Sequence, residues 1–200
     1  MRKVLYTAIL SLFTITASAQ VALNTEGQDP QYVETIKGRA QKIVDGLQLT
    51  DAQKAENVRN IIANRYFLLN DIHAKYDKNQ QDALQAELYK HHFELASALA
   101  LYLNEEQIDA VKDGMTYGRL KRDYNAQLEM IPTLKDEEKT QILIWLKEAR
   151  EYAMDAADSK GKHFWFDKYR GRTNNWLSAR GYDLKKEREE WMKRNTERSK

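Results

Sequence analysis

Apolar residues recur at steps of three and four along most of this 200-residue chain, and no other feature restricts its fold as strongly. Val33, Ile36 and Ala40 show the pattern early, and Ile142 and Leu146 show it in the second half. This spacing gathers apolar side chains on one face of a helix, whereas a strand would need them at every second position. Glycine and proline, with eight and two residues, are too rare for a turn-rich β fold. We therefore predict an all-α fold, an irregular bundle of five to seven helices.

The start of the chain has the composition of an export signal. Arg2 and Lys3 give a basic beginning, residues 4–15 are mostly apolar, and Ala17 to Ala19 supply the small residues of a cleavage site. The apolar run is too short to span a bilayer comfortably. We predict a cleaved signal peptide over residues 1–19, with cleavage after Ala19 and a mature protein in the periplasm or outside the cell.

The absence of cysteine adds to this expectation. Without a cysteine after the apolar run, the export signal is not expected to end in a lipid anchor, so we expect no membrane attachment after cleavage. Disulfides, thiolate metal sites and cysteine nucleophiles are excluded as well, and packing alone must stabilise the protein.

The remaining chain divides into a leader, one helical domain and a polar tail. Residues 20–29 lack periodicity and end in Asp29-Pro30, an N-cap followed by a proline suited to the first helical position. We assign residues 30–182 to the helical domain. Residues 183–200 are assigned to a polar C-terminal helix or tail that Asp183 can cap.

Two parts of the helical domain are less regular. A polar break at residues 78–81 separates the second helix from a third, which we expect to run from Leu84 to Leu103. Residues 113–132 are left without an assignment, because two glycines four residues apart disfavour an uninterrupted helix there.

A short capping pattern occurs at two of the expected helix starts. Thr50 with Gln53, and Asn104 with Gln107, place a capping side chain three residues before a glutamine that can reach back to the capping residue's amide. The pattern resembles the motif of the Leu-Thr-x-x-Gln class of periplasmic chaperones, exported helical proteins that hold unfolded clients. That resemblance implies a chaperone-like role, while simple helix capping explains the same residues without kinship.

Four longer stretches stand out in the sequence, at Lys112–Tyr117, Glu129–Pro132, Trp145–Glu151 and Lys168–Leu177. Together they resemble the hallmark stretches of a secreted bacterial family, domain of unknown function 3826, seen mainly in Bacteroidetes-type bacteria. The resemblance implies export and an all-helical domain. The family brings no activity, so it assigns no catalytic residue.

The stretch from Gly161 to Tyr182 mixes aromatic and basic residues more finely than a simple helix face requires. Rings stack on sugar faces, arginine and asparagine donate directional hydrogen bonds to hydroxyls and carboxylates, and such residues also dominate protein interfaces. We predict a site here for an acidic or neutral saccharide, or for a protein partner. Its residues are Tyr169, Arg170, Arg172, Asn174, Asn175, Trp176, Tyr117 and His163. In the alternative interpretation, the rings close the core and the arginines pair with acidic residues.

The histidines give weaker indications of catalysis or metal binding. His163 and Asp167 are four residues apart, so the carboxylate could orient the imidazole for acid–base work, although a solvated helix face produces the same spacing. His91 with Glu87 and Glu94 has a helical spacing that suits a divalent metal, but a hydrogen-bonded histidine is the simpler interpretation. We assign no catalytic residue, no metal ligand and no cofactor.

From the sequence we expect an exported, non-enzymatic binding or accessory protein whose ligand is a saccharide. The alternative is a chaperone-like protein that holds unfolded clients, and a weaker alternative is a hydrolase or lyase that uses His163 and Asp167. The formal net charge of +2 gives no argument for nucleic-acid binding. The sequence does not specify an oligomeric state.

Overall fold

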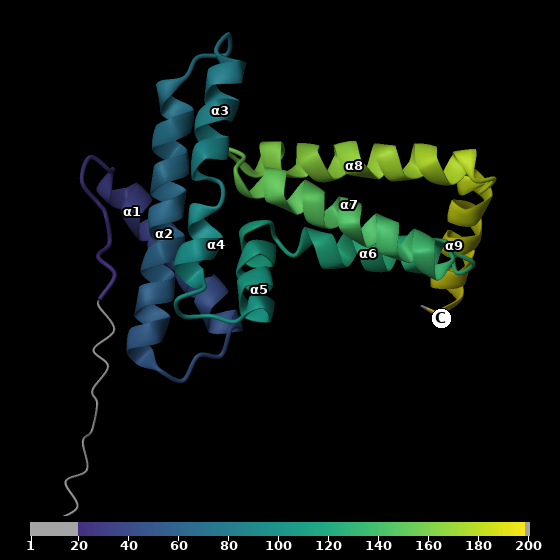
Figure 1. The fold of residues 1–200 in the computed structure, drawn as a ribbon. Helices are drawn as coiled ribbons and strands as arrows, with labels where there is room; N and C mark the ends of the chain where they lie inside the picture. Colours follow the sequence, from purple (N-terminus) through teal and green to yellow (C-terminus); the bar gives the residue numbers. More distant parts are fainter. Residues whose placement is uncertain (1–19, 199–200) are drawn as a thin grey trace, which may run out of the picture.

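The structure, a computed structural model, describes residues 20–198 and consists there of helices joined by short connections (Figure 1). The predicted signal peptide, residues 1–19, lies outside the described residues. In chain order the helices are α1 (Pro30–Gly46), α2 (Ala52–Lys75), α3 (Gln81–His91), α4 (Glu94–Leu99), α5 (Glu105–Met115), α6 (Arg119–Met130), α7 (Asp136–Met154), α8 (Ser159–Ala179) and α9 (Leu184–Arg198).

The all-α prediction is confirmed, but the predicted number of helices is too low. Nine helices are present in residues 20–198, compared with the five to seven expected. The difference arises because the predicted third helix divides into α3 and α4, and because residues 113–132 contain the end of α5 and all of α6. No helix in this part of the chain is both long and apolar enough to cross a membrane.

Local capping chemistry sets several helix starts where the sequence predicted them. The Asp29 carboxylate accepts the backbone N–H of Tyr32 at 2.9 Å, with Pro30 in the first turn of α1. At α5, Asn104 and Gln107 exchange the two hydrogen bonds of the predicted capping box, at 2.9 and 3.2 Å. Each of these starts depends only on residues within one turn of it, which is why the sequence revealed them.

The start of α2 differs from the prediction by one residue. Asp51, not Thr50, is the N-cap, and its carboxylate accepts the N–H of Lys54 at 3.0 Å. Gln53 donates to the side chain of Asn57 at 3.4 Å instead of reaching back. Aspartate and threonine both cap well, so residue type does not decide between neighbours. The first copy of the chaperone-like pattern therefore does not form the predicted capping box.

Two breaks divide the less regular part of the chain. At the end of α3, the Arg65 side chain donates to the backbone oxygen of His91 at 2.8 Å, and this contact from another helix coincides with the break. Because α3 ends at His91 and α4 ends at Leu99, the prediction of one helix from Leu84 to Leu103 is wrong. Between α5 and α6, Tyr117 and Gly118 have φ angles of 61° and 62°, which an α-helix does not allow.

Two large apolar clusters hold the helices together. The first is formed by α1, α2, α4 and α5, with Met154 from the end of α7, and the second is formed by α6, α7, α8 and α9. A smaller cluster joins α2 to α3. In Figure 1, α7 and α8 run side by side away from the group of α1 to α5, and α9 lies at their far end. Helices from both groups surround the cavities described below.

An ion group around one buried arginine fixes the two sets of helices to each other. Arg150 of α7 is 3% exposed and donates to Asp109 and Asp113 of α5 at 2.6 and 2.7 Å. A guanidinium that is buried away from solvent needs such partners, because an unpaired buried charge is strongly destabilising. The ion group therefore holds α7 against α5.

Candidate functional site

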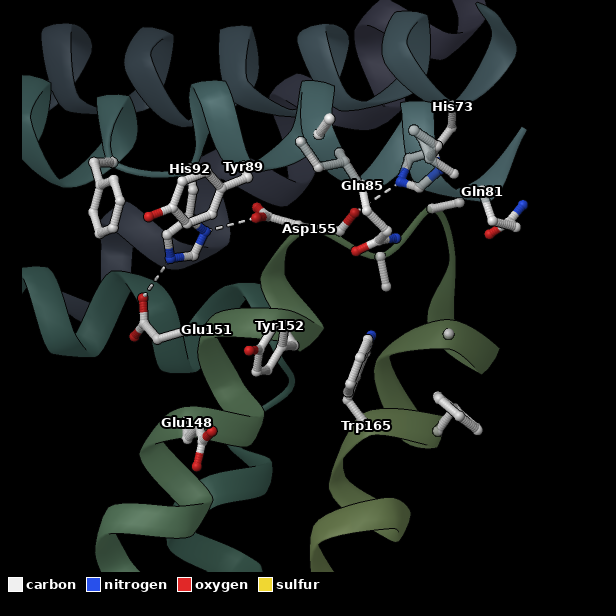
Figure 2. Close-up of a pocket in the computed structure, with 18 residues that line it drawn as sticks. His73, Gln81, Gln85, Tyr89, His92, Glu148, Glu151, Tyr152, Asp155 and Trp165 are labelled. Carbon is white, nitrogen blue, oxygen red and sulfur yellow. Dashed lines mark hydrogen bonds and ion pairs between the residues drawn. The ribbon is translucent and has the colours of Figure 1, made fainter. Parts of the chain in front are cut away.

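A cavity of about 880 Å³ opens between α3 and the α7–α8 pair. Figure 2 shows Gln81, Gln85 and Tyr89 of α3 on one side, with Tyr152 of α7 and Trp165 of α8 on the other. Cavities of a few hundred to about a thousand Å³ are typical of small-molecule sites. Its volume therefore makes this cavity the first candidate for a functional site.

One wall of the cavity contains a histidine between two carboxylates. His92, in the turn between α3 and α4, places Nδ1 2.7 Å from Asp155 Oδ2 and Nε2 3.6 Å from Glu151 Oε2 (Figure 2). Arg65 of α2 donates to the other Asp155 oxygen at 2.5 Å. The Nε2 atom of His73 lies 2.7 Å from the backbone oxygen of Asp155. Asp155, the C-cap of α7, thus joins α2, α3 and α7 at one point.

This network positions the wall rather than offering a free catalytic group. Both carboxylate oxygens of Asp155 are occupied, and the residue is 8% exposed. Glu151 is held in turn by Lys112 of α5, whose Nζ donates to it at 2.9 and 3.0 Å. An imidazole between carboxylates can transfer protons, but these carboxylates are already paired with cations. Their main effect is to fix the shape of the cavity.

The accessible part of the wall is largely aromatic. Tyr152 and Trp165 stack with ring centroids 4.5 Å apart and planes 18° from parallel. Tyr89, Phe93 and Phe164 are 71%, 62% and 58% exposed, so most of each ring is open to solvent. Exposed rings gathered around a cavity form a stacking surface for a ligand with apolar faces.

Amide and carboxylate groups complete the lining. Gln81 and Gln85 are exposed, and neither makes a side-chain hydrogen bond within the described residues. Glu148 is about half exposed. No lysine or arginine is among the described residues that line this cavity. The lining therefore offers hydrogen-bond acceptors to a ligand's hydroxyl groups and no cation to a ligand's carboxylate.

A sequence profile of the family described as protein of unknown function (DUF3826) matches residues 33–85 and 78–196. The chain belongs to the DUF3826 family. The match contains α2 to α8 completely, and the family expected from the four hallmark stretches is confirmed. All residues that line the cavity lie within the matched part of this DUF3826 protein. No curated protein matches the chain.

The site residues predicted from the sequence lie mainly on α8 of the DUF3826 protein, outside the cavity. Tyr169 is buried, and its burial, together with a hydrogen bond to Glu148, raises the pKa of its hydroxyl. Arg172 pairs with the same Glu148 at 3.5 Å. Trp176 packs edge-on against Trp145 of α7, with ring centroids 5.1 Å apart. These three predicted residues thus join α8 to α7.

The other predicted polar residues of α8 do not gather around a cavity. Arg170 pairs with Asp167 at 3.4 Å, and both side chains are about half exposed. Asn174 is partly buried and Asn175 is exposed. Arg170 and Asn174, four residues apart, share a face of α8, whereas Asn175 points about 100° away from Asn174.

The fine mixture of rings and cations on α8 has a local explanation. The Arg180 guanidinium lies 4.3 Å from the ring centre of Trp176, and Lys168 Nζ lies 4.7 Å from that of Trp165. Each cation follows its ring by three or four residues, so both are on the same helix face. A cation over a ring contributes about 0.5–1 kcal/mol at an exposed site. The pattern therefore stabilises the surface of α8 without a ligand.

His163 and Tyr117 lie close together but away from this cavity. Arg119 of α6 donates to His163 Nδ1 at 2.6 Å and to Asp167 at 2.5 Å. The guanidinium therefore lies between the histidine and the carboxylate considered for acid–base chemistry. The Tyr117 ring centre is 6.1 Å from that of His163, and Tyr117 also lines a second cavity.

Most of the residues that line the cavity were not predicted from the sequence. Glu148, Glu151 and Asp155 follow the spacing i, i+3, i+7, which places them on one helix face, and that signal was available. The contact of Glu151 and Asp155 with His92 depends on how the turn after α3 is placed against the end of α7, and no local pattern contains it. His91, considered as a metal ligand, lies 2.9 Å from Glu94. In the described part of the chain, no three metal-ligating side chains are arranged to hold an ion.

Proposed function

We propose that this DUF3826 protein is an exported, non-enzymatic protein that binds a neutral saccharide between α3 and the α7–α8 pair. The observation that carries the proposal is the composition of the cavity wall, where exposed rings stand beside amides and carboxylates. A sugar presents apolar faces that stack on rings and hydroxyls that donate to acceptors. The cavity wall contains both the rings for stacking and the acceptors for the hydroxyl groups.

The charge of the wall distinguishes a neutral from an acidic saccharide. Glu148 and Glu151 line the cavity, and the cations nearest to them, Arg172 and Lys112, lie outside its lining and are paired with these same carboxylates. A carboxylate on the ligand would therefore find no cation in the lining that is free to pair with it. Of the two saccharide classes expected from the sequence, this favours the neutral one.

Export is proposed from the composition of residues 1–19. If cleavage follows Ala19, the protein recovered from the periplasm or the medium begins with Gln20, which mass spectrometry of the N-terminal peptide detects. Recovery from the cytoplasm with Met1 retained would contradict this part of the proposal.

The exposed rings also fit the chaperone-like alternative, because apolar surface can hold an unfolded client. The amides and carboxylates beside the rings favour the saccharide. A light-scattering assay with an aggregating client protein separates the two functions. Suppression of aggregation at equimolar protein, in the absence of any saccharide response, would support the chaperone instead.

The direct test is a thermal-shift screen of the purified protein against neutral oligosaccharides. Tyr89→Ala and Phe93→Ala remove cavity rings that are largely exposed, so both variants should fold. Leu101→Ala, at a 79% exposed position outside the cavity lining, is the matched control. A ligand at a hundredfold excess over its Kd adds about 2.7 kcal/mol of stability. We expect this shift in the wild type and the control, and its loss in the two cavity variants.

Arg172→Ala and Trp176→Ala separate the cavity from the surface of α8. A shift that is lost only in these variants would move the site to α8 and contradict the cavity assignment. A response to acidic but not neutral saccharides would contradict the charge argument. Chromatography of the saccharide after incubation detects cleavage, and new products would show that the non-enzymatic part of the proposal is wrong.

A further inference from the structure

A second cavity, of about 710 Å³, is lined in part by the connection between α7 and α8. Residues of α1, α2, α5 and the first turn of α8 form its wall. Ala156 and Ala157, in this connection, are the described residues that line both cavities. The second cavity therefore has its own lining and can be assessed independently.

Three cations line this cavity among the described residues. Arg39 and Lys42, three residues apart on α1, are exposed, and neither forms an ion pair within that part of the chain. Lys162 is 5% exposed, and its Nζ donates to the backbone oxygens of Ala153 and Met154 at 3.2 and 3.3 Å. Two of the three cations are thus available to a ligand.

Negative charge is scarce at the same wall. Asp158 is the one carboxylate among the described lining residues, and its Oδ1 already accepts the backbone N–H of Gly161 at 2.7 Å. The lining is therefore net positive, whereas that of the first cavity is net negative. An anion that enters would be attracted to Arg39 and Lys42 without displacing a partner from either.

Hydroxyl and amide groups supply further donors. Tyr32, Tyr66 and Tyr117 line the cavity together with Asn70. Burial, with a smaller contribution from Tyr117, raises the pKa of Tyr66 to about 12, so its hydroxyl keeps its proton and can donate. Phenol rings with such donors suit a hydroxylated molecule better than a bare inorganic ion.

We propose that the second cavity binds an anionic, hydroxylated molecule such as a sugar acid or a sugar phosphate, whose carboxylate or phosphate group is held by Arg39 and Lys42. The proposal does not depend on the neutral-saccharide site, because the two linings share only the connection between α7 and α8.

Isothermal titration calorimetry tests this with glucuronate and glucose 6-phosphate as probes and with glucose as their neutral counterpart. We expect at least one anion to bind the wild type, glucose to bind at least tenfold more weakly, and the Arg39→Ala/Lys42→Ala variant to lose at least tenfold in affinity. Lys78→Ala/Lys185→Ala removes the same charge at exposed lysines outside both cavities and should bind as the wild type does.

Each outcome has one meaning. If neither anion binds the wild type, or if the Arg39→Ala/Lys42→Ala variant binds as tightly as the wild type, the site is refuted. If glucose binds as tightly as the anions do, Arg39 and Lys42 do not contribute to ligand binding, and the proposal is refuted. If inorganic phosphate binds as tightly as glucose 6-phosphate, the hydroxylated part of the ligand does not contribute to binding, and that part of the proposal is refuted. The Tyr89→Ala variant should keep its affinity for the anion, and a loss there would place the anion in the first cavity.

Discussion

Replacement of Lys162 by methionine should change how the stability of the protein depends on pH. Burial lowers the pKa of Lys162 from 10.5 to about 8, because the dry surroundings disfavour its charged form. Among the charges that face it, Asp155 and Asp158 oppose this shift, while Arg39 and Arg65 add to it. In the unfolded chain the same ammonium group is solvated and keeps its ordinary pKa.

The sign of the effect follows from counting protons. Between pH 8 and pH 10.5 the unfolded chain holds a proton on Lys162 that the folded protein lacks, so the free energy of unfolding rises with pH there. The slope approaches about 1.4 kcal/mol per pH unit. Summed from pH 7 to pH 10, the gain is about 2 to 3 kcal/mol. Lys162→Met lacks the titrating group and therefore lacks this gain.

Urea unfolding followed by tryptophan fluorescence at pH 7, 8, 9 and 10 measures the difference. We expect the stability of the wild type minus that of Lys162→Met to increase by about 2 to 3 kcal/mol over this range. Lys160→Met, at an exposed position of the same helix, is the control, and its difference from the wild type should stay constant. A constant difference for Lys162→Met as well would refute the reasoning, because it would mean that the folded state leaves this ammonium group solvated.

Four further substitutions test the packing by urea unfolding. Gly114→Ala should destabilise the protein by about 1–3 kcal/mol, because the added Cβ would lie 2.9 Å from the side chain of Ile43. Gly38→Ala, with open space around the added Cβ, should instead stabilise α1 by about 0.5–1 kcal/mol. Arg150→Met should cost about 1–3 kcal/mol, since it leaves partly buried Asp113 without its cation and Asp109 with Lys147 alone. Tyr182→Phe removes a 2.6 Å hydrogen bond to buried Glu138 and should cost about 1–3 kcal/mol. That bond lowers the pKa of Glu138, so its contribution is present above pH 4.5 and is lost on acidification, and the cost of Tyr182→Phe should shrink in an acid titration.

The elements that the sequence predicted well are those whose causes are local. Asp29 with Pro30 and Asn104 with Gln107 satisfy helix ends within a single turn, and Gly118 has the positive φ that stops a helix. The break after α3 could not be predicted in this way, because it involves the side chain of Arg65, 26 residues away. Local patterns thus predicted where helices begin, whereas the end of one of them coincides with a distant contact.

The same distinction applies to the candidate site. The rings and cations of α8 were interpreted as a binding surface, although pairs such as Trp176 with Arg180 stabilise each other on the helix itself. The carboxylates of α7 share a face that the sequence reveals, but their partner His92 lies 63 residues from Asp155. A cavity whose walls come from separate helices is determined by how those helices pack, and composition alone does not contain that information.

The division of the apolar residues into two clusters also has a consequence for folding. The first cluster draws on residues up to 115, the second begins at residue 120, and Met154 is the one buried residue from the later part of the chain that joins the first. Contacts between residues close in sequence form quickly, so each cluster can collapse by itself during synthesis or refolding. The junction, where Met154 docks and both cavities lie, needs both halves of the chain, so we expect it to form last. A ligand bound at either cavity would therefore act on the final step of assembly and slow the first step of unfolding.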